Sequence, residues 1–62
     1  MLKKYKVTFE ERINGVWRDD YFSNNGMGFK YNDALYIAQS IKHGLDGIPV
    51  RNIQIEEMGG DE

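Results

Sequence analysis

The chain has 62 residues, no cysteine and a formal net charge of −2, and hydrophobic residues make up 40% of it. A chain of this length buries only about 60% of the surface that it exposes when unfolded, so it can build one core but not a second domain or a deep catalytic cleft. The lack of cysteine excludes disulfides, thiolate metal sites and a cysteine nucleophile, and a single histidine leaves few other metal sites. We therefore expect a protein that is not an enzyme and holds no metal or cofactor.

The start of the chain is basic, but it does not resemble an export signal. Thr8, Glu10 and Glu11 interrupt the apolar stretch that such a signal needs. The longest apolar run, from Ala34 to Ala38, is far shorter than the roughly 20 residues that span a bilayer. The sequence predicts a cytoplasmic protein without a membrane segment.

Two strands joined by a tight turn are predicted first. Tyr5, Val7 and Phe9 alternate with polar residues, which is the period of a strand with one buried face. Asn14-Gly15 follows, and an Asn-Gly pair between two runs of β-forming residues is the strongest short-range signal of a hairpin. We expect the strands at residues 4–13 and 16–22.

The length of the turn decides which side chains of the second strand face the core. A two-residue turn at 14–15 places Val16 and Phe22 on the core face and leaves Trp17 and Tyr21 outside. A three-residue turn at 13–15 with a glycine bulge reverses the two sets. Both alternatives leave apolar side chains on the uncovered face.

A helix and a third strand follow a loop at 23–28. Asn32 and Asp33 suit a helix start, and Gly44 suits the residue that ends a helix after Lys42 and His43. Between them, apolar residues recur at the three- and four-residue spacing of one helix face, so we expect a helix at about 33–43. Alternation resumes in a third strand at 50–57, and the glycine-rich, acidic residues 58–62 are expected to form a flexible tail.

These elements predict a single α+β domain over residues 1–57, with the order ββαβ. One helix would pack on a small three-stranded, mainly antiparallel sheet in two layers. The third strand could lie beside the first strand, which makes the whole sheet antiparallel, or beside the second strand as a parallel neighbour. We prefer the antiparallel order, because the long alternation of the first strand fits a central position.

The uncovered face of this sheet is the main candidate for function. Tryptophan, tyrosine and arginine are the residues that most often anchor protein interfaces, whereas a purely structural cross-strand aromatic cluster is the more ordinary explanation. The functional hypothesis is a small protein-binding module, a regulator, inhibitor or adaptor, that engages an unidentified protein or a second copy of itself as a homodimer. The candidate partner-binding residues are Arg12, Trp17, Tyr21 and Phe22.

The alternative hypothesis is a nucleic-acid-binding accessory domain. Residues 1–18 hold five cations against two acids, while residues 19–62 hold three cations against eight acids. A basic hairpin could follow a nucleic-acid backbone, but an acidic domain is atypical of such binding. The candidate residues for this alternative are Lys3, Lys4, Lys6, Arg12 and Arg18.

Overall fold

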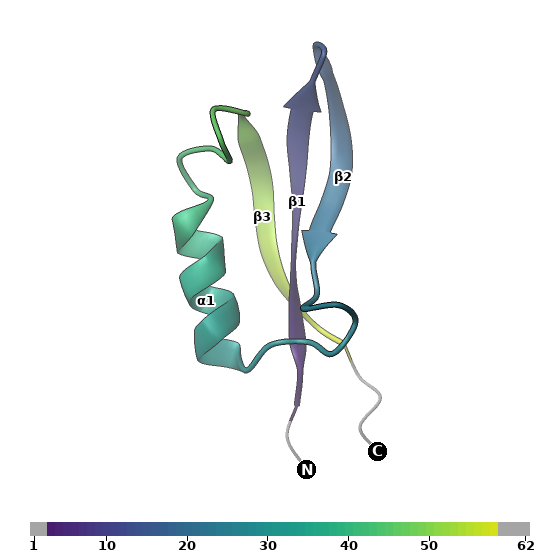
Figure 1. Ribbon diagram of the computed structural model, residues 1–62, viewed down its shortest axis with the longest axis vertical. Helices are drawn as coiled ribbons and strands as arrows, with labels where there is room; N and C mark the ends of the chain where they lie inside the picture. Colours follow the sequence, from purple (N-terminus) through teal and green to yellow (C-terminus); the bar gives the residue numbers. More distant parts are fainter. Residues whose placement is uncertain (1–2, 59–62) are drawn as a thin grey trace.

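The computed structural model describes residues 3–58, and these form one helix and one three-stranded sheet (Figure 1). Of the predicted tail at 58–62, only residue 58 is within this range, and residues 59–62 lie outside it. The elements in chain order are β1 (Tyr5–Ile13), β2 (Val16–Phe22), α1 (Tyr31–Ser40) and β3 (Val50–Glu57). The strand order is β2-β1-β3 with both pairs antiparallel, which confirms the α+β fold and the central first strand.

The hairpin between β1 and β2 has a two-residue turn. Asn14 and Gly15 both have positive φ, 54° and 79°, as a type I′ turn requires, and Ile13 lies opposite Val16. This register places Trp17 and Tyr21 on the sheet face turned away from the helix. The two-residue alternative is therefore the one that the molecule adopts.

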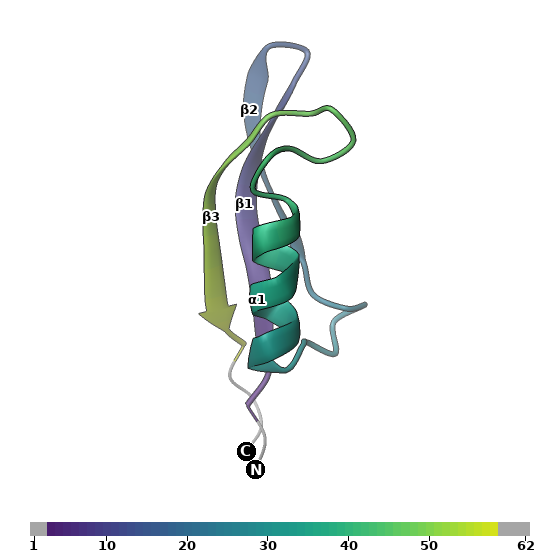
Figure 2. The same ribbon diagram turned by 90° about the vertical axis from the view of Figure 1, so that its left-hand side faces the viewer.

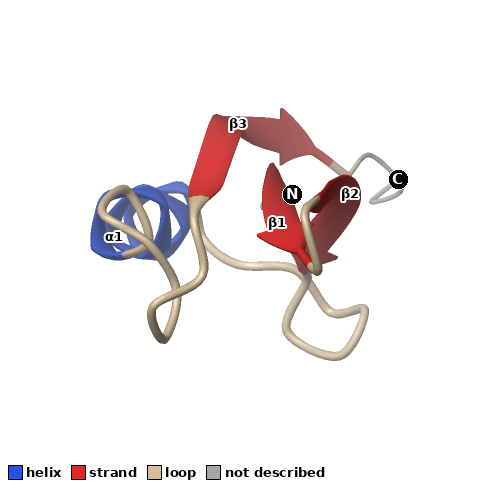
Figure 3. Ribbon diagram, turned by 90° about the horizontal axis from the view of Figure 1, so that it is seen from above, coloured by secondary structure: helices blue, strands red, loops and turns tan. Residues whose placement is uncertain are grey.

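The helix covers only part of the sheet. It packs against β1 and β3, and no Cα atom of α1 comes within 8 Å of a Cα atom of β2, both elements lying wholly in the described range. Figures 2 and 3 show α1 close to β3 and β1, with β2 at the far side of the sheet. The core between the layers is small: its buried hydrophobic residues are Val7, Phe9, Ala34 and Ile41.

The helix starts two residues before the predicted position and ends three residues earlier. Two backbone hydrogen bonds, of 2.9 and 2.8 Å, tie Phe29 to Tyr5, so the chain leaves the sheet there and turns into the helix at once. Lys30 takes the N-cap position without a side-chain cap, and Asn32 lies inside the first turn. At the other end the Ser40 hydroxyl donates to the Tyr36 carbonyl at 2.8 Å. Among the described residues there is no helix with the length and apolar character needed to cross a membrane.

A bulge distinguishes β3 from the other strands. Between the pairs Thr8–Gln54 and Glu10–Arg51, β1 has one residue and β3 has two. Asn52, one of these two residues, has a positive φ of 57°, and this backbone conformation accommodates the extra residue. Bulges bend a strand and increase its twist, and β3 is visibly curved in Figure 1.

Candidate functional site

The sheet face turned away from α1, here called the open face, is built from alternate residues of all three strands. It is slightly concave, with a hollow of about 450 Å³ near its centre. Among the residues that line this hollow are Glu10, Asp19, Tyr21 and Glu56. By the strand register the open face carries Lys6, Thr8, Glu10, Arg12, Trp17, Asp19, Tyr21, Arg51, Gln54 and Glu56.

One end of the open face is closed by a contact that spans the sheet. The guanidinium of Arg51 lies over the Trp17 ring, with its carbon 4.0 Å from the ring centroid. The same side chain donates from Nε to Glu10 Oε1 at 2.6 Å. Trp17 is consequently half-buried although no helix covers it.

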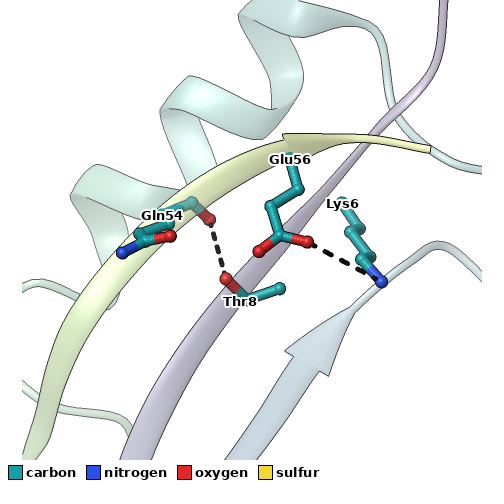
Figure 4. A network of polar contacts seen from close by, with 4 residues as sticks. All are labelled: Lys6, Thr8, Gln54 and Glu56. Carbon is teal, nitrogen blue, oxygen red and sulfur yellow. Dashed lines mark hydrogen bonds and ion pairs between the residues drawn. The ribbon is translucent and has the colours of Figure 1, made fainter. Parts of the chain in front are cut away.

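The other end holds a looser version of the same arrangement, and Figure 4 shows its polar contacts among Lys6, Glu56, Thr8 and Gln54. The Lys6 ammonium lies 5.4 Å from the Tyr21 ring centroid and 4.0 Å from Glu56 Oε1. Beside it the Thr8 hydroxyl donates to the Gln54 carbonyl at 3.5 Å. Tyr21 remains 56% exposed, so this end offers the larger free aromatic surface.

The predicted partner-binding residues divide between the two faces. Arg12, Trp17 and Tyr21 lie on the open face, with Arg12 directly opposite Trp17. Phe22 lies on the helix side, where its ring packs 5.3 Å from that of Phe9 and contributes to the core. Only the first three therefore share one face of the sheet.

The outer edge of β2 presents backbone groups that pair with no other strand in the described part of the chain. The Arg12 amide donates to the Pro49 carbonyl at 3.0 Å, so even-numbered residues of β1 turn their backbone groups toward β3. The odd-numbered residues of β1 therefore form the backbone hydrogen bonds with β2. In an antiparallel ladder such hydrogen-bonded pairs alternate with pairs in which the backbone groups of both residues point away from the partner strand. By this register the groups of Trp17, Asp19 and Tyr21 point outward from the sheet.

Several features leave this edge accessible. β2 is paired with β1 in an unbroken register over its whole length and, among the described strands, has no other neighbour. Val16 is on the helix side yet is 56% exposed, because α1 does not reach β2. Of the outward amides, that of Tyr21 donates to Asp20 Oδ1 at 2.8 Å. Asp19 and Asp20 partly protect this edge from unwanted pairing by their negative charge, as edge strands commonly require.

Two carboxyl groups, those of Glu11 and Asp20, interact on the helix side of the hairpin. The Asp20 carboxylate raises the pKa of Glu11, first by hydrogen bonding and also by its charge, and the desolvation of Glu11 acts in the same direction. Arg18, directly opposite Glu11, partly offsets this effect. Glu11 is only 8% exposed, so this level of the hairpin holds an unfavourable acidic contact.

Four of the five cations of the nucleic-acid alternative, Lys3, Lys6, Arg12 and Arg18, are spread over the sheet. Lys3 lies 3.8 Å from Glu57, and Lys6 is engaged with Glu56. Arg12 is six residues from Lys6 along β1, which is roughly 20 Å in an extended strand. Arg18 faces the opposite side of the sheet, across from Glu11. This placement gives the alternative no support.

Two important residues were missing from the sequence-based candidates. Arg51 and Glu10 complete the contact that covers Trp17. Strict alternation along β3 places Arg51 on the same face as Ile53, and only the bulge at Asn52 moves it to the open face. Within residues 3–58 no group of three or more histidine, aspartate or glutamate side chains is arranged to hold a metal ion. Comparison with protein families, curated proteins and solved structures gives no match.

Proposed function

We propose that the protein is a non-enzymatic, cytoplasmic protein-binding module, a small regulator, inhibitor or adaptor, that adds its edge strand β2 to a strand of its partner. The observation that carries this proposal is the state of β2: seven residues in regular register, paired on one side and left uncovered by α1. In strand addition the main-chain hydrogen bonds supply affinity and the flanking side chains supply specificity.

The side chains beside this edge suit a protein partner. An added strand would meet Trp17 and Tyr21 on the open face, with Arg12 behind Trp17. On the other face it would meet Val16, which is 56% exposed, and the rim of Phe22. Aromatic and arginine side chains beside an accessible backbone are typical anchors of protein interfaces.

The opposite edge is a poorer candidate. β3 is bent by the bulge at Asn52, and a bent, irregular edge matches a straight incoming strand badly. Ile53 and Ile55 of β3 pack against the core, so the helix side of this strand is already occupied. The β3 edge can therefore serve as the control for strand addition at the β2 edge.

The test uses one proline on each edge. Asp19→Pro removes an outward N–H of β2, and Glu57→Pro is the matched control on β3, where residue 57 lies opposite Tyr5 in a pair that points away from β1. Circular dichroism first establishes that both variants fold. Partners captured from the soluble fraction of the source cells are then purified and tested for binding to the parent chain and to each of the two proline variants.

We expect such a partner to bind the parent chain and Glu57→Pro, and to lose at least about tenfold in affinity for Asp19→Pro. Amide hydrogen exchange should show new protection at Trp17 and Asp19 in the complex. Equal binding to both proline variants, or protection confined to other strands, would refute edge-strand addition.

A further inference from the structure

The amino-acid order of β2 is chemically symmetric about its central residue, Asp19. Apolar Val16 and Phe22 lie at its two ends, followed inward by aromatic Trp17 and Tyr21. Next to the centre, Arg18 is matched by its charge complement, Asp20. When two identical strands pair in antiparallel orientation about a two-fold axis, residues equally distant from the axis face one another.

The outward backbone groups restrict where that axis can pass. Only pairings that bring the outward residues Trp17, Asp19 and Tyr21 opposite one another form a ladder. An axis at residue 18 places Arg18 opposite its own copy, and an axis at residue 20 does the same with Asp20. An axis at Asp19 places each Arg18 opposite an Asp20 and overlaps the strand along its whole length.

We propose that the partner of the β2 edge is a second copy of this chain, paired in antiparallel register about Asp19. The inference rests on the edge-strand addition proposed above and names its occupant. Two three-stranded sheets would then join into one continuous sheet with about six new main-chain hydrogen bonds. On the open face each Trp17 meets a Tyr21 of the other copy, and on the helix side each Val16 meets a Phe22.

The monomer is arranged so that this pairing displaces little. α1 stays more than 8 Å from β2 between Cα atoms, so the helix does not obstruct an incoming strand. The Tyr21 amide would exchange its bond to Asp20 Oδ1, now 2.8 Å, for a carbonyl of the second copy. The released Asp20 carboxylate would then meet Arg18 of that copy. The unfavourable element is the meeting of the two Asp19 side chains at the axis.

Charge reversal gives the sharpest test of the register. Arg18→Asp places acids opposite acids in a self-pair, and Asp20→Arg places cations opposite cations. Each variant alone should dimerise at least about tenfold more weakly than the parent chain. An equimolar mixture restores both opposite-charge contacts, so a heterodimer should form with an affinity close to that of the parent dimer.

A third variant is expected to strengthen the dimer. Asp19→Asn removes the repulsion at the axis and should lower the dissociation constant about fivefold. Asp33→Asn in the first turn of α1 makes the same change in net charge away from β2 and should have no effect. This pair remains informative if Arg18→Asp, which adds an acid beside Glu11, fails to fold.

Sedimentation equilibrium and light scattering over a wide concentration range measure these association constants. The proposal is overturned if the parent chain and Asp19→Asn remain monomeric at millimolar concentration, or if a dimer forms that ignores both charge reversals. If the chain is monomeric but Asp19→Pro abolishes binding to a different protein, self-pairing is refuted and edge-strand addition is not. A register-dependent dimer with partner binding unaffected by Asp19→Pro would refute edge-strand addition to other proteins.

Discussion

Arg51 of β3 stacks on Trp17 of β2 across the full width of the sheet, with the central strand β1 between them. The 2.6 Å hydrogen bond from Arg51 to Glu10 ties the same side chain to β1. One arginine therefore connects all three strands on a face that no helix protects. This contact stabilises the open face and explains why Trp17 is half-buried there.

Arg51→Gln should lower the free energy of unfolding by about 1 kcal/mol, because an exposed cation–π contact and a surface ion pair each contribute a fraction of that amount. Urea unfolding followed by the fluorescence of Trp17, the single tryptophan, measures both the loss of stability and a red shift of the native emission. Arg12→Gln is the control on the same face, opposite Trp17, and should change stability much less. Equal effects of the two substitutions would contradict the role given to Arg51.

The core prediction concerns Val7, which is 0% exposed at the centre of β1. Val7→Ala removes two buried methyl groups and leaves a cavity, which should cost about 2 kcal/mol. Tyr36→Ala on the outer side of α1, where the side chain is 72% exposed, should change stability by less than about 0.5 kcal/mol. A shift in the urea midpoint that is similar for both variants would argue against this placement of the core.

Alanine substitutions at Gly28 and Gly26 distinguish the stability lost to backbone strain from that lost to steric overlap. Both have positive φ, 79° and 86°, so alanine at either position pays about 1 kcal/mol for a left-handed conformation. A Cβ at Gly28 would lie 2.5 Å from Lys4 Cβ, whereas one at Gly26 meets nothing within 4 Å. Gly28→Ala should therefore cost about 1–3 kcal/mol more than Gly26→Ala in thermal or urea unfolding. Equal losses would show that the 23–28 loop does not pack against Lys4, just before β1.

The stability of the fold should rise on acidification because of Glu11. Its pKa is raised in the folded state, chiefly by Asp20, so the folded chain binds this proton more tightly than the unfolded chain does. The free energy of unfolding then increases as the pH falls from the raised pKa toward the ordinary value for glutamate, and decreases in the opposite direction. Glu11→Gln should be more stable than the parent chain at neutral pH and should lose this part of the pH dependence.

Urea unfolding at several pH values between 4 and 7 measures this difference between the two proteins, with Glu57→Gln on exposed β3 as the control. A Glu11→Gln variant that is destabilised at neutral pH, with an unchanged pH profile, would show that the carboxyl pair is not repulsive.

The sequence allowed the strands to be predicted because alternation and the Asn14-Gly15 turn are local signals with strict geometry. It favoured the antiparallel strand order without excluding the parallel one, because no local signal specifies which strand pairs with the third. The helix boundaries were displaced because the bonds between Phe29 and Tyr5, which join distant parts of the chain, set its start. The bulge at Asn52 interrupts an otherwise regular alternation and had no local signal. The partners of Trp17 and the burial of Glu11 depend on cross-strand neighbours, which the sequence pattern alone does not specify.

Because α1 packs over β1 and β3, the residues that form the buried core differ from the β2 residues that we propose for recognition. Small domains usually use the same residues for both purposes. Three of the four buried hydrophobic residues come from β1 and α1, and Ile41 follows α1 directly. The residues of β2, apart from Phe22, lie outside this core. Most of β2 could therefore be exchanged, to change what the protein binds, while the buried core keeps its sequence. In that sense the chain is a compact scaffold with one replaceable strand.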